Sequence, residues 1–129
     1  MADKQMIEKY QKFVDSISFE ELFNYIRNIT GLKDLKFTIT QKEDRFGYPR
    51  IEFKSQDLIE KVGFLKVIFS NIYICNFNSE IRYNSENDSF FYWCTVSIDY
   101  THPGGGSNGK TFLTARYKAN NWTIDNYSD

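Results

Sequence analysis

Apolar residues near the N-terminus recur at the spacing of helices with one buried face. In residues 3–17 they follow the i, i+3, i+4, i+7 pattern. They are Met6, Ile7, Tyr10, Phe13, Val14 and Ile17. Ser18 followed by Glu21 has the form of a capping box, and Gly31 is a stop signal. The spacing therefore predicts two helices, over residues 3–17 and 19–30.

Beyond Gly31 the period of the apolar positions changes from helical to twofold, as in strands with one buried face. The inward positions of the first such segment are Leu35, Phe37 and Ile39. Residues 44–48 have the composition of a turn, and Ile51 and Phe53 resume the alternation after it. We therefore expect a hairpin.

The middle of the chain changes character twice. Residues 57–62 suit one or two helical turns. The segment 64–75 is mostly apolar, which is typical of strands buried on both faces. We expect two strands here, with a bend at Ser70 and Asn71.

The clearest strand spans residues 90–101. One of its faces is apolar throughout and carries Phe90, Tyr92, Cys94, Val96, Ile98 and Tyr100. The other face begins with Phe91 and Trp93 and then turns polar. An alternating segment at 77–83 and a polar turn at 84–89 come before it, which predicts an antiparallel pair.

The C-terminal part adds a glycine-rich loop and a second hairpin. The loop covers residues 103–109. The strand that follows has the inward positions Leu113, Ala115 and Tyr117. Asn120 and Asn121 then turn the chain into a last short strand with Trp122 and Ile124.

Together these elements predict an α+β fold in one domain, residues 1–129. An amphipathic helix pair must bury its apolar stripe, so we expect both helices to pack on a curved antiparallel sheet of six to seven strands. The segment 108–124, NGKTFLTARYKANNWTI, is similar to the last hairpin of cystatin-like and nuclear-transport-factor-like folds, which also place helices before a curved sheet. That resemblance implies a cone-shaped sheet and brings no functional motif with it.

Charge and composition exclude several classes of function. With 16 Lys and Arg against 17 Asp and Glu, the formal net charge is -1, so direct nucleic-acid binding is not expected. The N-terminus is charged where a signal peptide needs an apolar core, and no apolar run approaches the ~18 residues of a membrane span. Cys75 and Cys94 suit free thiols in a reducing compartment. We therefore expect a cytoplasmic protein without a membrane partner.

Three residue patterns invite a chemical interpretation, and each lacks a required part. Residues 104–111, GGGSNGKT, match the P-loop string, but the next residues alternate as a strand where a P-loop needs a helix. Asp99, His102 and Ser107 supply the residue types of a hydrolase triad, yet Ser107 lies among glycines that would hold it loosely. One histidine and two distant cysteines do not suffice for a zinc site. We expect no catalytic residue, no metal and no cofactor.

The remaining signals are the glycine-rich tip and the aromatic residues on the polar side of residues 90–101. Glycines leave backbone groups accessible to a partner. Phe91 and Trp93 form an exposed interface patch if the helices cover the opposite face. We therefore predict a non-enzymatic protein-binding module. Its predicted contact residues are Phe91, Trp93, Gly105, Ser107 and Asn108.

The source and type of this module are suggested by residue usage. Phe, Tyr, Ile, Asn and Lys are abundant, and their codons are dominated by A and T. This bias favours an AT-rich bacterium, or a phage or mobile element living in one. The function hypothesis is accordingly an inhibitor of anti-defence, anti-CRISPR or immunity type that acts by binding a partner protein.

Two other functions fit the same sequence. A cone-shaped sheet would enclose an apolar pocket for a small ligand or substrate, with Asp99 or Tyr100 as a polar group at depth. A self-associating structural subunit would show a mass that depends on concentration. A filled core with exposed aromatic residues favours the binding module over the cone.

Overall fold

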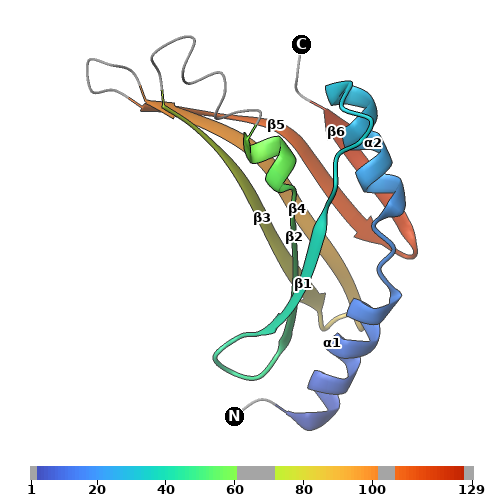
Figure 1. Ribbon diagram of the computed structural model, residues 1–129. Helices are drawn as coiled ribbons and strands as arrows, with labels where there is room; N and C mark the ends of the chain where they lie inside the picture. Colours follow the sequence, from blue (N-terminus) through green and yellow to red (C-terminus); the bar gives the residue numbers. More distant parts are fainter. Residues whose placement is uncertain (1–2, 61–71, 102–106, 127–129) are drawn as a thin grey trace.

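The computed structural model describes residues 3–60, 72–101 and 107–126, with the side chains of residues 3–60, 75–97 and 113–125 (Figure 1). Its elements are α1 (Lys4–Ser16), α2 (Glu20–Thr30), β1 (Thr38–Glu43), β2 (Pro49–Lys54), β3 (Ile72–Asn84), β4 (Ser89–Thr101), β5 (Ser107–Lys118) and β6 (Asn121–Asn126). Residues 56–60 are also helical. The predicted α+β class is confirmed. Within these ranges, no helix has the length and apolar character needed to cross a bilayer.

Both N-terminal helices form where the apolar spacing predicts them. The Asp3 side chain caps α1 by accepting a first-turn amide at 2.9 Å. Gly31 ends α2 in the left-handed conformation, with a φ of 71°. The capping box predicted at Ser18 and Glu21 is wrong, because the N-cap of α2 is Phe19 and has no side-chain hydrogen bond. Phe19 takes this position because its ring is buried in the core.

The strands form two antiparallel sheets, so the prediction of one sheet with six to seven strands is wrong. One sheet is the hairpin β1–β2, and the other has the order β3-β4-β5-β6. β2 lies beside β3, where the Ser79 hydroxyl donates to the Ile51 carbonyl oxygen at 3.1 Å. Pro49 of β2 has no amide hydrogen for a neighbouring strand, and the chain turns from β2 into a helix at residue 56. Both features limit the backbone hydrogen bonds that β2 and β3 can form with each other.

Two strands of the larger sheet are longer than predicted. β3 runs without a break, whereas the sequence suggested separate strands on either side of residue 76. β5 begins at Ser107, inside the segment 103–109 that was expected to be a loop. Both extensions pair with β4, which offers a partner along its whole length. The predicted bend at Ser70 and Asn71 lies outside the described residues.

The helices cover one face of the four-stranded sheet, which curves around them (Figure 1). The inward side chains of β4 and β5 are buried, namely Tyr92, Cys94, Val96, Leu113, Ala115 and Tyr117. The buried side chains of the helices and the segment between them are Val14, Phe19, Leu22, Phe23 and Ile26. A register shift between Val96 and Ser97 marks a bulge, which increases the bending of the sheet.

β1 lies beyond this core. Leu35 is buried, and Phe37 stacks on Phe23 with ring centroids 4.0 Å apart, as their predicted inward positions require. Ile39 was expected to continue this inward series, but it is 46% exposed. The reason is that β1 starts only at Thr38 and runs beyond the area that the helices cover.

Candidate binding face

Phe91 and Trp93 lie on the face of the four-stranded sheet that the helices leave open. Side chains alternate between the two faces along β4, and Tyr92, Cys94 and Val96 occupy the buried face. Phe91 and Trp93 therefore point away from α1 and α2, and both are half-buried. The sequence alone did not decide whether the helices cover these two aromatic side chains. In the structure they do not.

We call this open surface the outer face. Its described residues share the alternation phase of Trp93 in the strand register. They are Asn76, Asn78, Glu80, Arg82, Asn84, Ser89, Phe91, Trp93, Thr95, Ser97, Thr114, Arg116, Lys118, Asn121, Thr123 and Asp125. The outer face is thus polar except for two aromatic residues on one of its central strands.

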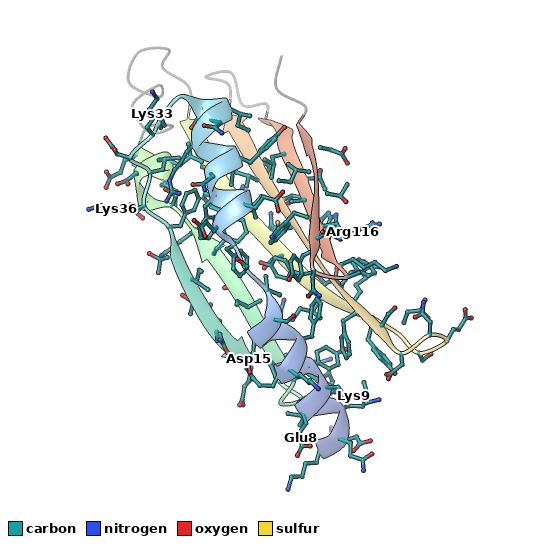
Figure 2. The ribbon with its side chains drawn as sticks, turned by 90° about the vertical axis from the view of Figure 1, so that its right-hand side faces the viewer. Glu8, Lys9, Asp15, Lys33, Lys36 and Arg116 are labelled. Atoms are coloured by element: carbon teal, nitrogen blue, oxygen red, sulfur yellow. The ribbon has the colours of Figure 1, made fainter. Side chains whose placement is uncertain are left out.

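Charged residues flank the aromatic pair on both neighbouring strands. Trp93 is paired with Glu80 of β3 and with Arg116 of β5. The Arg116 guanidinium lies 4.9 Å from the centroid of the Phe91 ring, a cation–π contact, and projects away from the helices in Figure 2. Arg82 forms an ion pair with Glu80 at 3.1 Å. Arg116 has no ion-pair partner among the described residues, so its donors are accessible to a ligand.

The predicted tip residues lie at the far end of β4 from the aromatic pair. Ser107 and Asn108 belong to β5, where they pair with Thr101 and Tyr100 at the far end of β4. Thr101 lies ten positions along β4 from Phe91, about 33 Å of extended chain. Ser107 and Asn108 are therefore distant from Phe91 along the sheet, and their role as contact residues stays a prediction. Gly105 lies outside the described residues.

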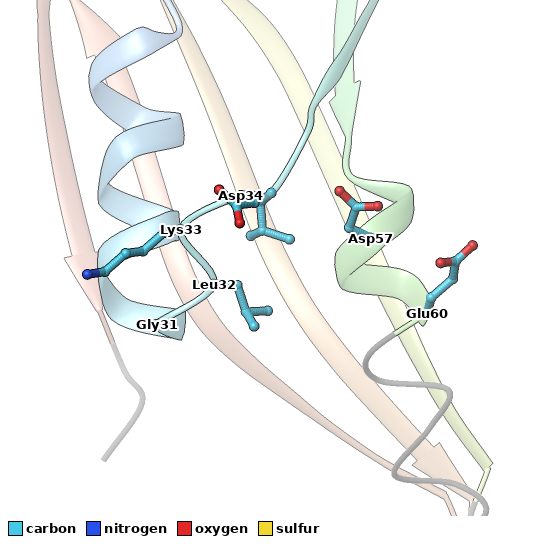
Figure 3. Close-up of a pocket in the computed structure, with 7 residues that line it drawn as sticks. Gly31, Leu32, Lys33, Asp34, Asp57 and Glu60 are labelled. Atoms are coloured by element: carbon cyan, nitrogen blue, oxygen red, sulfur yellow. The ribbon is translucent and has the colours of Figure 1, made fainter.

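An open cleft lies at the other side of the molecule, between the end of α2 and residues 56–60. Its volume is about 760 Å³. It is lined by Gly31, Leu32, Lys33, Asp34, Leu35, Asp57 and Glu60 (Figure 3). The Asp57 carboxylate accepts the amide of Lys36 at 3.0 Å and so holds the loop that leads to β1. The described residues contain no cluster of His, Cys, Asp and Glu suited to a metal ion.

The buried nucleophiles are poorly suited to catalysis. Burial raises the pKa of the Cys75 thiol to about 11 and that of the Cys94 thiol to about 12, so both carry their protons near neutral pH. The Tyr92 hydroxyl is also buried, lies near Ser79, and has no hydrogen-bond partner among the described residues. Burial raises the pKa of this phenol as well. Tyr92 and Cys94 are fully enclosed by the core, whereas Cys75 is 7% exposed and lines a small pocket beside β2.

A polar cluster at the opposite end of the sheet joins α1 to the β3–β4 turn. One Asp88 carboxylate oxygen accepts from the Tyr83 hydroxyl at 2.7 Å and from the Lys9 ammonium at 3.0 Å. These two hydrogen bonds hold the pKa of Asp88 below its usual value. The cluster is exposed, and its bonds connect α1 to the β3–β4 turn.

The stacking of Arg116 on Phe91 is the part of the site that sequence reasoning missed. The alternation of Arg116 with the buried Ala115 and Tyr117 placed it on the polar face of its strand. Its position beside Phe91 depends on the register between β4 and β5, which the sequence pattern does not contain. Comparisons with protein-family models, with curated proteins and with solved structures find no match to this chain.

Proposed function

We propose that this chain is a non-enzymatic protein-binding module and that its outer face receives the partner. The observation that carries the proposal is the position of Phe91 and Trp93 on an open sheet face, with Arg116 stacked on Phe91. Hot spots of protein interfaces are enriched in aromatic residues and arginine, and aromatic side chains bury a large area each. Thr95 and Thr114 beside them suit the polar rim of such an interface.

The packing of the inner face supports surface binding over a ligand enclosed by the sheet. The rings of Phe19 and Tyr92 meet edge to face with centroids 5.6 Å apart. Trp122 lies 5.8 Å from Phe19 and 6.1 Å from Tyr92 on the same measure. Side chains therefore occupy the space in which the alternative, a ligand-binding cone, would hold its ligand.

In its specific form the proposal is a cytoplasmic inhibitor or immunity protein of a phage or mobile element. The AT-rich residue usage supports such a source. The near-zero net charge supports a protein partner over a nucleic acid, because no basic field exists to attract phosphates.

The test starts with affinity capture from cells of the source organism and continues with the purified partner. The captured protein is titrated with the wild-type chain and with Trp93→Ala. Arg116→Glu is a second variant, because it alters the outer face at an exposed position and leaves the core intact. Lys12→Ala is the matched control, since it removes an exposed cation of α1 on the opposite side of the sheet.

We expect both outer-face variants to weaken binding at least about tenfold, the usual loss at a hot spot, while Lys12→Ala binds like the wild type. Circular dichroism checks that each variant is folded. Equal binding by all three variants would reject the outer face as the binding site. A purified chain that turns over a substrate without any partner would reject the module itself.

A further inference from the structure

β1 is the outermost strand of the small sheet, and one of its edges is open. β2 pairs with one edge of β1, and no strand in the described ranges pairs with the other. All six residues of β1 are exposed. Figure 2 shows the strand at the rim of the molecule, beside α1 and away from the rest of the sheet. An open edge is a template for an added strand.

The hairpin turn determines which backbone groups face that edge. The Asp44 amide donates to the Tyr48 carbonyl oxygen at 2.9 Å, so this pair is hydrogen-bonded across the hairpin. In an antiparallel ladder, bonded and non-bonded pairs alternate. Thr38, Thr40 and Lys42 therefore bond to β2. The N–H and C=O groups of the alternate residues, Ile39, Gln41 and Glu43, point outward.

The side chains of these same three residues share the face of the hairpin that carries α1. Ile39 is paired with Phe53 and Gln41 with Ile51, and both partners are buried toward the helices. The Gln11 side chain of α1 donates to Gln41 Oε1 at 3.2 Å. An added strand at this edge would therefore point alternate side chains to the side of the hairpin on which α1 lies.

The flank beside the open edge is acidic. Gln11 also donates to the Asp15 carboxylate at 2.8 Å, which places Asp15 next to Gln41, and Figure 2 shows Asp15 close to β1. Glu8 lies one helical turn before Gln11, toward the end where Glu43 is located. Asp15, Glu8 and Glu43 have no ion-pair partner among the described residues.

The nearby lysines form no ion pair with these three carboxylates among the described residues. Lys42 projects from the other face of β1 and pairs with Glu52 at 3.0 Å. Lys4 and Lys12 each lie one helical turn from Glu8, but neither forms an ion pair with it among the described residues. The flank therefore favours basic side chains on the incoming strand.

We propose that β1 accepts an extended segment of a partner protein as an additional antiparallel strand. The segment carries an apolar residue opposite Ile39 and basic residues opposite Gln41 and Glu43. The inference goes beyond the proposed function, because β1 and the outer face belong to different sheets. A second copy of this chain fits less well, because two acidic flanks would meet. A six-residue edge is also small beside the ~800 Å² per partner of a stable interface.

The probe is the synthetic peptide TKTKTVT, aligned with its valine opposite Ile39 and its lysines opposite Gln41 and Glu43. Two methylated forms make the test specific. In the first form, N-methyl groups on the lysine and valine amides block the donors that face β1. In the second form, methyl groups on the threonine amides lie on the side away from β1. Binding to the full-length chain is followed by fluorescence anisotropy and by NMR shifts of the β1 amides.

We expect the first methylated form to bind at least about tenfold more weakly than the parent peptide, because its hydrogen bonds are lost. The second form keeps the affinity within about threefold, since its ladder donors remain. On the protein, Gln41→Pro removes an outward donor without removing a bond to β2, and it abolishes binding. Asp15→Lys weakens binding of this basic peptide severalfold, whereas Glu20→Lys on α2 has no effect.

Three results would overturn the proposal. They are an equal loss with both methylation patterns, the absence of binding at millimolar peptide, and self-association of the chain through the β1 amides. The methylated peptides keep the test valid even if Gln41→Pro does not fold. Trp93→Ala is expected to bind the peptide like the wild type, so failure here and failure of the outer face are distinguishable.

Discussion

The indole N–H of Trp122 donates a hydrogen bond to the backbone carbonyl oxygen of Ser18 at 2.6 Å. Beside it, the Tyr117 hydroxyl donates to the Ser16 carbonyl oxygen at 2.9 Å. The two bonds tie the β5–β6 hairpin to the end of α1 and to the short connection between α1 and α2. They hold the helices on the inner face of the sheet and thereby leave the outer face open.

Replacing Trp122 with Phe removes this bond but keeps an aromatic ring in the packing with Phe19 and Tyr117. We expect the free energy of unfolding to fall by about 1–2 kcal/mol, because one hydrogen bond and part of the ring contact are lost. Urea unfolding followed by circular dichroism measures the change. An unaltered unfolding midpoint would show that the bond contributes nothing to the placement of the helices.

Tyr92 and Tyr117 lie opposite each other in the register and are both buried, but their hydroxyl groups differ. The Tyr117 hydroxyl donates to Ser16, whereas that of Tyr92 has no hydrogen-bond partner among the described residues. We expect Tyr117→Phe to lower the free energy of unfolding by about 1 kcal/mol. Tyr92→Phe is expected to leave it unchanged or raise it by up to about 1 kcal/mol, because the change removes an unsatisfied buried group. Parallel urea titrations compare the two variants, and the opposite order would contradict this assignment.

The buried thiols make stability depend on pH in the alkaline range. The pKa of Cys75 is raised from 9.0 to about 11 and that of Cys94 from 9.0 to about 12. The native state therefore holds these protons more tightly than the unfolded state, so the associated stability is present below pH 9 and lost as the pH rises toward the folded values.

We expect the urea midpoint to fall as the pH is raised from 9 to 11. The variant carrying both Cys75→Ala and Cys94→Ala should show a shallower fall, and this comparison separates the thiols from lysine and tyrosine titration. Native iodoacetamide labelling at pH 8 should also be slow. An identical pH dependence in the variant would contradict the assignment.

Gly47 closes the β1–β2 turn with a φ of 86°. A Cβ at this position would lie 3.7 Å from the Ile7 side chain, which is ordinary contact, so the cost of substitution is conformational. We expect Gly47→Ala to destabilise the chain by about 1 kcal/mol, because alanine disfavours the left-handed region. Gly47→Asn should lose less, since asparagine tolerates this conformation. Thermal unfolding compares them, and equal losses would point to a steric cause instead.

Much of this fold is visible in local patterns. The apolar spacing in α1 and α2 places their helices within one residue of the observed bounds, because a helix of this kind is defined by neighbours three and four positions apart. The alternation along β4 likewise puts Phe91 and Trp93 together and opposite Tyr92. These features require no knowledge of distant parts of the chain.

Other features depend on segments far apart in the sequence. The division into two sheets follows from how β2 approaches β3, and the stacking of Arg116 on Phe91 follows from the register of β5 against β4. Ile39 is exposed because the helices do not cover β1. The alternation of apolar residues around Ile39 nevertheless matches that of a buried strand.

The sequence by itself determined the α+β class, the two helices and the pairing of side chains on each strand face, since period and composition are local properties. Only the tertiary structure decided which face the helices cover, where the sheet divides and which strand edge stays open. Those outcomes depend on packing and backbone hydrogen bonds between distant residues, and no stretch of sequence contains both partners of such contacts.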